Sequence, residues 1–319
     1  MGVLKDGLRR ASFSVKDLDV SGTLSGAFSN GGNTYYVDSS YSVTGGGTAW
    51  DDPYITITEA VAKSLADGGH HDTILVRGTD TAETSGTITN DYAETVIIAA
   101  AQVGLRIIGC GNRHTGVPWT CGTQDEAILT INAKDCYVSG FHLRPNGAAT
   151  GCGIYFMCST DMTDNAVGST VENCLIRSTT ETALAGIRIN AANDITIKDC
   201  IFSSVVTAIA SLEVGGSVQY RTRILNNQVD DKCTNGFSVG GVSMLIKDNV
   251  FSSGLTIVID SGQHTSAKDN VVIGNHLFCG TSYAINCVAA TGDNWAGNWI
   301  NINTEGSEVY GGVTVLVPT

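Results

Sequence analysis

Several charged residues recur at one position of a repeated sequence pattern, two residues after the central hydrophobic residue of each repeat. This position holds Arg144, Arg177, Ser203 and Asp230, and Asp231 follows directly. Two carboxyl groups about 5–9.5 Å apart can hydrolyse a glycosidic bond, and a base beside a positive charge can carry out an elimination. Asp230 and Asp231, with Arg177 or Arg144, are therefore the candidate catalytic residues. The alternative interpretation is a row of solvated surface charges.

Other side chains could bind a ligand or a metal ion. His70 and His71 are adjacent, so their side chains point apart and a role in a turn is favoured over a metal site. None of the ten cysteines has C-x-x-C spacing, so they are interpreted as small buried hydrophobic residues, with disulfides as the alternative. Trp119 lies in a predicted loop at 109–126, where an exposed ring could stack on a sugar. We therefore predict no metal site and one candidate binding residue, Trp119.

These residues must be positioned by the elements that the repeat encodes. The strings "IKDCIFSS" at 197–204 and "IKDNVFSS" at 246–253 are nearly identical, and related segments recur every 22 to 27 residues. Short polar side chains suit a tight corner, because they bond to backbone groups and tolerate left-handed conformations. The fourth residues of these segments form a predicted structural ladder: Cys174, Cys200, Asn227, Asn249, His276 and Asn298.

A second column of short apolar segments keeps pace with the first, from "GIYF" at 153–156 to "GVTV" at 312–315. Each repeat therefore carries at least two short strands separated by turn residues. A repeat of roughly 20–30 residues is the signature of a solenoid. The 38 glycines and the weak helical periodicity favour a β-solenoid. Equivalent residues of adjacent coils would lie about 4.8 Å apart, which puts Asp230 roughly 10 Å from Arg177, two coils away.

The stretch 34–79 contains a Tyr-Val-Asp strand, a Gly-rich loop, a short helix and then "DTILV". It resembles the N-terminal opening of the right-handed parallel β-helix superfamily, the pectin-lyase-like proteins. The resemblance extends over residues 34–319 and implies an all-β, single-stranded, right-handed parallel β-helix. A capping helix is predicted at 53–66, with Asp51 or Asp52 as its N-cap and Pro53 at its first position. Such a helix would cover the open end of the solenoid.

A polar arm at residues 1–33 precedes the predicted β-helix domain. Within it Phe13, Val15, Leu18 and Val20 alternate, as in a strand that needs a sheet partner. By resemblance to phage appendage proteins, we expect this arm to mediate homotrimer formation and attachment to capsid or tail proteins. The net charge of −13 argues against nucleic acid as a partner. No apolar run approaches the roughly 20 residues of a membrane-spanning helix, so no membrane insertion is expected.

Three classes of function follow from the resemblance. The favoured class is a structural virion protein of a phage, such as a capsid decoration protein, head fibre or tailspike, which could bind a cell-surface glycan. The alternative is an extracellular polysaccharide lyase or glycoside hydrolase, and only the lyase would use Ca²⁺ as a cofactor. The second alternative is a carbohydrate-binding module without turnover. The motifs of the polygalacturonase type are not present as a set, so catalysis is not favoured.

Overall fold

The computed structural model describes residues 32–78, 92–111, 116–147, 150–157, 166–178, 183–212, 219–260, 267–286 and 293–302. The predicted arm at 1–33 lies outside the described residues, except for its last two. The C-terminal segment 303–319 lies outside them as well. The described part of the chain holds no helix that is long and apolar enough to span a membrane.

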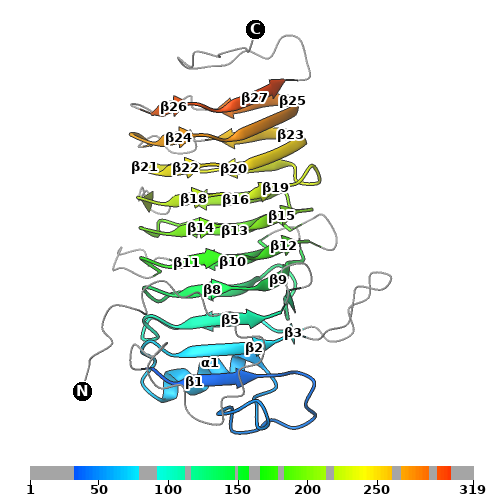
Figure 1. Cartoon of the computed structure of the whole chain (residues 1–319), viewed down its shortest axis with the longest axis vertical. Helices are drawn as coiled ribbons and strands as arrows, with labels where there is room; N and C mark the ends of the chain where they lie inside the picture. Colours follow the sequence, from blue (N-terminus) through cyan, green and yellow to red (C-terminus); the bar gives the residue numbers. More distant parts are fainter. Residues whose placement is uncertain are drawn as a thin grey trace, which may run out of the picture. The chain divides into compact units, whose positions relative to one another are not determined.

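Each coil begins with a short strand whose central apolar residue points inward. Ile197, for example, is fully buried, whereas Thr196 and Lys198 on either side are partly exposed. Ten of these strands pair in parallel, in chain order, and form the first face of the stack (Figure 1). They are β1 (Thr34–Val37), β2 (Thr73–Arg77), β5 (Arg106–Cys110), β8 (Tyr137–Ser139), β11 (Thr170–Glu172), β14 (Thr196–Lys198), β18 (Arg223–Leu225), β22 (Leu245–Lys247), β24 (Val271–Ile273) and β26 (Asn294–Ala296).

The second face follows after a tight corner. It consists of β3 (Tyr92–Ala93), β6 (Val117–Thr120), β9 (Phe141–Arg144), β12 (Leu175–Arg177), β15 (Ile201–Ser203), β19 (Gln228–Val229), the first parts of β23 (Val250–Asp260) and β25 (His276–Asn286), and β27 (Trp299–Ile302). The third face consists of β4 (Val96–Ile98), β7 (Ala127–Ile131), β10 (Cys152–Phe156), β13 (Ala185–Asn190), β16 (Thr207–Leu212), β20 (Asn235–Ser238) and the second parts of β23 and β25. Because β23 and β25 run through both faces, the two ladders join in one 15-stranded sheet. A short parallel pair, β17 (Gln219–Tyr220) with β21 (Gly241–Val242), lies apart from these faces.

All strand pairings in the described residues are parallel, and the coils from β2 to β25 each pass from the first face to the second and then the third. The described chain is therefore a right-handed, single-stranded parallel β-helix, as the repeat and the resemblance predicted. The interior is filled by the inward side chains of all three faces.

Glycines in the third face make room for aromatic side chains of the second. A Cβ added to Gly186 would lie 2.6 Å from the ring of Phe202, and one added to Gly236 would lie 2.8 Å from the ring of Phe251. Both rings are fully buried. The glycines of the repeat therefore serve to let large rings fill the interior.

The corner between the first and second faces has a left-handed residue followed by a ladder residue, which is buried in the coils up to Asn275 and partly exposed at Asn298. The left-handed residues are Asn173, Asp199, Asn226, Asp248, Gly274 and Gly297. The ladder residues are Cys174, Cys200, Asn227, Asn249, Asn275 and Asn298. The predicted ladder therefore contained one wrong member. Asn275 continues the ladder because Gly274 takes the left-handed position, whereas His276 is the first residue of β25 and is exposed.

The helix α1 (Ile57–Ala66) packs on β1, β2 and β4 at the N-terminal coils and fits the predicted cap. It begins later than predicted. Its N-cap is Thr56, whose side chain accepts the backbone N–H of Glu59, while the Glu59 side chain accepts the backbone N–H of Thr56. Asp52, one of the two expected caps, instead accepts the backbone N–H of Gly46 at 2.9 Å.

The N-terminus of α1 is also held by the second coil. The Glu94 carboxylate accepts the backbone N–H groups of Ile57 and Thr58, both at 2.8 Å. A negative charge at this end of a helix is stabilising, because the first N–H groups have no partner within the helix. Farther along, the Gln102 side chain donates to the Val61 carbonyl at 2.9 Å, so the helix is also held near the middle of its buried side.

Candidate functional site

The predicted catalytic column lies on the outer side of the second face. The strand register places Arg144, Arg177 and Ser203 in adjacent coils. In the next coil Asp230 continues the column, and the Ser203 hydroxyl donates to its Oδ2 atom at 2.9 Å. Arg177 is therefore two coils, or roughly 10 Å, from Asp230. The two arginines and the two aspartates lie along one face, but they do not converge on a single point.

Asp230 and Asp231 are in direct contact with each other. Burial acts to raise the pKa of Asp230, but the Lys232 backbone amide, Asp231 and the Ser203 hydroxyl lower it below its ordinary value. The hydrogen bond to Asp230 raises the pKa of the exposed Asp231. Two carboxyl groups that touch leave no space for the water or sugar that lies between the carboxyls of a glycosidase, which are about 5–9.5 Å apart.

Trp119 is a core residue, which contradicts its predicted role in binding. It lies in β6 rather than in a loop and is fully buried. Its ring packs edge-on against Phe141 with a centroid distance of 5.3 Å, and its indole N–H donates to the Glu94 carbonyl at 3.0 Å. A sugar cannot reach it. Exposed aromatic rings occur instead near the C-terminal coils, at Phe278 and Trp299.

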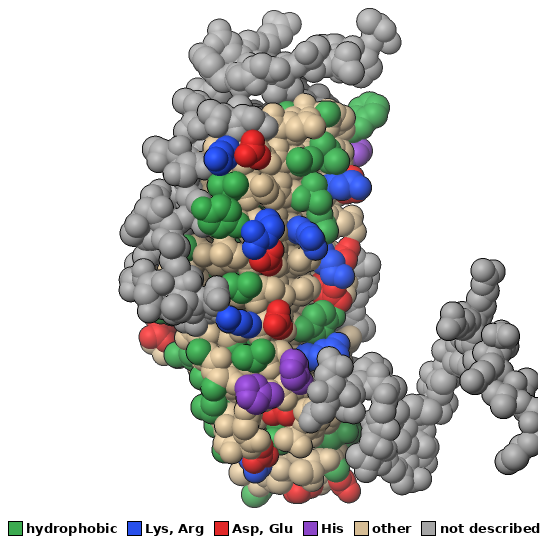
Figure 2. All heavy atoms as spheres, turned by 90° about the vertical axis from the view of Figure 1, so that its left-hand side faces the viewer, with side chains coloured by type: hydrophobic (Ala, Val, Ile, Leu, Met, Phe, Trp, Pro, Cys, Tyr) green, Lys and Arg blue, Asp and Glu red, His purple; other side chains and the backbone are tan. Residues whose placement is uncertain are grey.

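Charged side chains on the first face are mostly paired with one another. The guanidinium of Arg106 lies over the ring of Tyr137 at 5.0 Å, and the Tyr137 phenol donates to Glu172, which also pairs with Lys198. Figure 2 shows Lys and Arg side chains gathered over the middle coils on one side of the stack, with Asp and Glu among them. This surface therefore resembles a solvated charge network more than a one-sign patch.

A shallow cleft of about 240 Å³ opens at the corner between the first and second faces, in the early coils. Glycine backbone forms most of its wall, and Ser139 and Asn173 contribute the polar side chains. In the described ranges of the chain, no three His, Cys, Asp or Glu side chains come together in a way that could hold a metal ion.

A polar cluster on the third face was not found from the sequence. Its centre is Tyr155 in β10, which pairs in register with Arg188 of β13. The guanidinium of Arg188 lies 5.2 Å from the centre of the Tyr155 ring and donates to the Thr150 carbonyl at 3.1 Å. The Asn190 side chain, two residues further along β13, donates to the Tyr155 phenol oxygen at 3.0 Å. We call Tyr155, Arg188 and Asn190 the third-face cluster.

The third-face cluster contains buried polar atoms that lack a hydrogen-bond partner. These are Nε of Arg188 and Oδ1 of Asn190, and Asn190 is only 6% exposed. Oδ1 of Asn132, which lies two coils before Asn190 at the end of β7, is also buried without a hydrogen-bond partner. Native structures rarely leave such atoms unpaired, because each costs about 1–3 kcal/mol. A ligand that both donates and accepts hydrogen bonds would pair them if the partly exposed side chain of Arg188 moved to admit it.

One sequence signal could have indicated this cluster. Tyr155 and Arg188 occupy the same place in the second repeat column, in "GIYF" and "GIRI". Both interrupt an otherwise apolar segment with a long polar side chain, one coil apart. Asn132 could not be found in this way, because it follows its strand instead of lying within it.

Comparisons with known proteins add little to this geometry. No family model and no curated protein matches the chain. Among solved structures, the chain is similar to a pectin methylesterase from Aspergillus niger, with 14% identity over 91% of this chain and 92% of that one and a TM-score of 0.45. It is also similar to a GH136 lacto-N-biosidase from Eubacterium ramulus, with 10% identity over 85% of this chain and 68% of that one and a TM-score of 0.48.

A third similar structure is ORF18 of Geobacillus virus E2, with 10% identity over 78% of this chain and 59% of that one and a TM-score of 0.41. Similarities at this level carry no argument about function. The assignment of the fold depends on the parallel ladders and the capped stack themselves. By these features the chain is a right-handed parallel β-helix protein with a short helix at its N-terminal coils.

Proposed function

We propose that this chain is a non-catalytic structural protein on the surface of a phage particle, and that its third face binds a glycan of the host cell. The observation that carries the proposal is the third-face cluster, in which Arg188 Nε and Asn190 Oδ1 are buried without a partner beside Tyr155. A sugar hydroxyl donates one hydrogen bond and accepts others, so it matches one unpaired donor next to one unpaired acceptor.

The contacts within this cluster favour binding over turnover. They are made by a phenol, an amide, a guanidinium and a backbone carbonyl, none of which ordinarily transfers a proton near neutral pH. The residues first predicted as catalytic, Asp230 and Asp231, lie on a different face and contact each other. Substrate cleavage is therefore not part of the proposal.

The structural role is supported by features of the stack and of the sequence. A ladder of buried asparagines and a capping helix make the coils a rigid support for a binding surface. The arm at 1–33 resembles the segments that precede solenoids in phage appendage proteins. Through this arm we propose attachment to capsid or tail proteins, at the virion surface.

A polysaccharide lyase or glycoside hydrolase is the second candidate. It is favoured by the opposite pKa shifts of Asp230, which is lowered, and Asp231, which is raised. Carboxyl pairs whose pKa values move apart are used as acid and base in many enzymes. Ca²⁺ belongs only to the lyase version of this candidate. A carbohydrate-binding module without turnover would use the same third-face cluster but would be free of any particle.

The proposal is tested with the full-length chain and a surface polysaccharide extracted from host bacteria and immobilised on a biosensor. Tyr155→Ala and Arg188→Ala should each weaken binding at least tenfold. Ser238→Ala is the matched control, because Ser238 lies in the same outward column two coils further along and should bind as the parent does. Reducing ends and unsaturated products are measured in the same samples and should stay at background.

Particle association is tested separately, by mass spectrometry of density-gradient fractions from a phage lysate of the source strain. Peptides of this chain should follow the major capsid protein. Product release that disappears in an Asp230→Ala/Asp231→Ala variant would establish the enzyme candidate instead. Glycan binding by a chain that remains outside the particle fractions would establish the binding module.

A further inference from the structure

Cys174 and Cys200 occupy the same ladder position in adjacent coils, and we call them the thiol pair. Leu175 and Ile201, which follow them, pair in register between β12 and β15 (Figure 1). Equivalent residues of adjacent coils lie about 4.8 Å apart, which is within the roughly 4.4–6.8 Å between the Cα atoms of a disulfide. Both cysteines are free, and they are only 2% and 1% exposed. The fold therefore places two thiols close enough to form a bond between coils.

The two sulfur atoms of the thiol pair differ in acidity. A hydrogen bond from Cys200 lowers the pKa of Cys174 below its ordinary value, although burial opposes this. The backbone N–H groups of Phe141 and Gly140 also lower it. Burial and the hydrogen bond to Cys174 raise the pKa of Cys200 well above its ordinary value. Because the thiolate is the nucleophile, Cys174 is the reactive member of the pair and Cys200 holds the proton.

Other buried cysteines lack this arrangement. Burial raises the pKa of Cys136, Cys152 and Cys233 to about 12. In the strand register Cys152 is paired with Ala127 and Ala185 rather than with another cysteine. These three thiols fit the interpretation as small buried hydrophobic residues. The environment of Cys174 is therefore a property of its ladder position and not of burial alone.

The cleft at the corner between the first and second faces lies beside the thiol pair. Gly140 and Phe141, whose N–H groups act on the Cys174 sulfur, line this cleft, and so does Asn173, the residue before Cys174. A Cβ added to Gly140 would lie 2.3 Å from the Gly109 carbonyl oxygen, so the wall is backbone where a side chain would not fit. A cleft of about 240 Å³ admits molecules the size of a few waters. A small oxidant can therefore come close to Cys174.

We propose that the thiol pair is a redox-active site that reacts with hydrogen peroxide entering by this cleft. In the first step the Cys174 sulfur attacks one peroxide oxygen and the O–O bond breaks. The leaving hydroxide takes the proton of the Cys174 thiol and departs as water, so Cys174 becomes a sulfenic acid. In the second step the Cys200 sulfur attacks the Cys174 sulfur, and an S–S bond forms as the S–O bond breaks. The hydroxide released takes the Cys200 proton, so one peroxide is reduced to two waters.

The disulfide would join two coils at a corner that lacks the asparagine amides. From Asn227 onward, the side chain of each ladder residue accepts the backbone N–H of the ladder residue one coil earlier. Cys200 has only a thiol to offer to the coil of Cys174, and sulfur is a weak acceptor. The pair lies inside the stack at a different corner from the third-face cluster, so the proposal is independent of glycan binding.

Peptide mapping of the full-length, reduced chain after exposure to hydrogen peroxide tests the proposal. Trypsin cleaves after Arg177 and Lys198, so the two cysteines lie on different peptides unless a disulfide joins them. The parent should give a peptide that links Cys174 to Cys200 and that dithiothreitol separates. Cys200→Ala should instead accumulate a sulfenic acid at Cys174, which dimedone traps. In Cys174→Ala, oxidation of Cys200 should be at least tenfold slower. Cys152→Ala is the matched control and should form the same linked peptide as the parent.

Folding and access to the cleft are tested separately. The far-ultraviolet circular dichroism of the reduced variants should match that of the parent. Ser139→Leu enlarges a side chain in the wall of the cleft and should slow formation of the linked peptide at least tenfold. A parent in which Cys174 stays reduced while the exposed Cys110 is oxidised overturns the proposal. A disulfide between other cysteines in place of this pair overturns it too, as does linkage at an unchanged rate in Ser139→Leu.

Discussion

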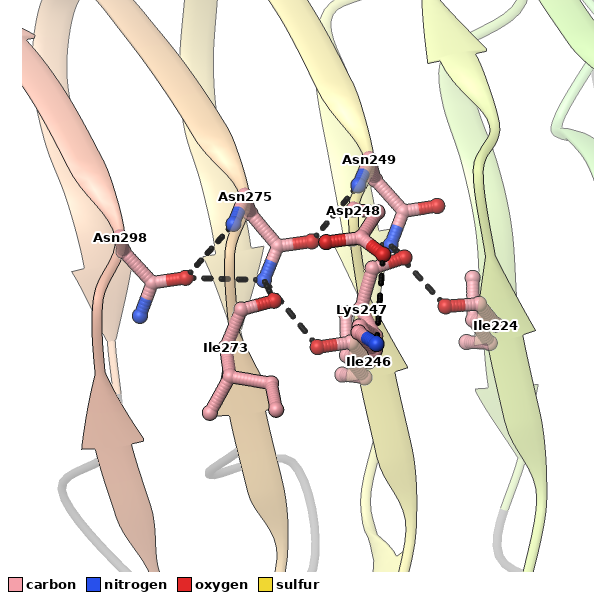
Figure 3. Close-up of polar contacts among 8 residues, drawn as sticks. All are labelled: Ile224, Ile246, Lys247, Asp248, Asn249, Ile273, Asn275 and Asn298. Carbon is pink, nitrogen blue, oxygen red and sulfur yellow. Dashed lines mark hydrogen bonds and ion pairs between the residues drawn. The ribbon is translucent and has the colours of Figure 1, made fainter.

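The Oδ1 atom of Asn275 accepts two hydrogen bonds from Asn249, one from its backbone N–H and one from its side-chain amide, both at 2.9 Å. The side-chain amide of Asn249 also donates to the Ile224 and Lys247 carbonyls, at 3.0 and 3.1 Å (Figure 3). Both asparagines are fully buried, so water cannot replace these bonds. The side chain of one asparagine per coil thus pairs backbone groups of its own coil and of the coil before it.

Replacing Asn275 should therefore destabilise the stack far more than replacing its neighbour. Asn275→Leu leaves buried backbone groups unpaired and should lower the free energy of unfolding by about 1–3 kcal/mol. His276→Leu changes an exposed side chain and should alter it by less than about 0.5 kcal/mol. Urea unfolding of dilute protein provides the measurement. Equal losses for the two variants would mean that the ladder runs through His276 after all.

Trp119 should contribute to stability and not to sugar binding. Trp119→Ala empties a large part of the core and removes the hydrogen bond to Glu94, so we expect a loss of about 3–5 kcal/mol. Trp299→Ala is the comparison, because that ring is 63% exposed and its loss should cost less than about 0.5 kcal/mol in the monomer. Glycan affinity should be the same in both variants. A selective loss of binding in the Trp119 variant would restore its predicted role.

The start of the capping helix can be tested by replacing, one at a time, the observed N-cap Thr56 and the N-cap suggested by the sequence, Asp51. Thr56→Ala removes a side chain that accepts the Glu59 N–H and should cost about 0.5–2 kcal/mol. Asp51→Ala removes the exposed residue that the sequence suggested as a cap, and the midpoint of thermal unfolding should not change. The opposite order of the two effects would place the start of the helix near Pro53.

Ionisation of Asp194 should stabilise the folded chain, whereas ionisation of Asp231 should destabilise it, so the two residues should change the pH dependence of stability in opposite directions. The hydrogen bonds from Arg221, at 2.7 Å, lower the pKa of Asp194 in the folded chain below its ordinary value of 3.8. The ionised form is thus favoured by folding, and its contribution is present at neutral pH and is lost as the pH falls below 3.8. Asp194→Asn should therefore destabilise the chain at pH 7, by at most about 1 kcal/mol for a surface pair, and have no effect in strong acid.

The same titration of Asp231→Asn provides the contrast. Its hydrogen bond to Asp230 raises the pKa of Asp231, so folding disfavours the ionised form. The variant should be no less stable than the parent at pH 7, and any gain should disappear in acid. Unfolding by urea at a series of pH values measures both variants. If the free energy of unfolding changed with pH in the same way in both variants, the hydrogen bonds assigned to Asp194 and Asp231 would be contradicted.

The repeat in the sequence was sufficient to predict the fold, because each coil repeats the same polar and apolar positions. The repeat was not sufficient to decide which residue is the fifth member of the ladder. "IGNHLFCG" offers two polar residues in a row, Asn275 and His276, and either could be aligned with Asn249. The deciding feature is conformational. The residue before the ladder must be left-handed, and Gly274 suits that position better than Asn275 does.

The positions of functional side chains were harder to predict than the coils. Trp119 follows an irregular insertion, so no repeat indicated whether it points inward. The capping box of Thr56 and Glu59 was present in "TITE", but Pro53 suggested an earlier start. The third-face cluster depends on two single atoms, Arg188 Nε and Asn190 Oδ1, remaining unpaired after folding, and no linear pattern contains that information.

The hydrogen bonds of the asparagine ladder can form only in the order in which the coils are synthesised. In every described corner from Asn227 onward, the backbone N–H of one coil is paired by the side chain of the coil that comes later in the sequence. A ribosome delivers the coils from the N-terminus, so each new coil emerges before the residue that completes its corner has been made. The corner at the growing end therefore always has one unpaired backbone N–H, and nascent chains that stall during translation would expose that group wherever they stop in this region.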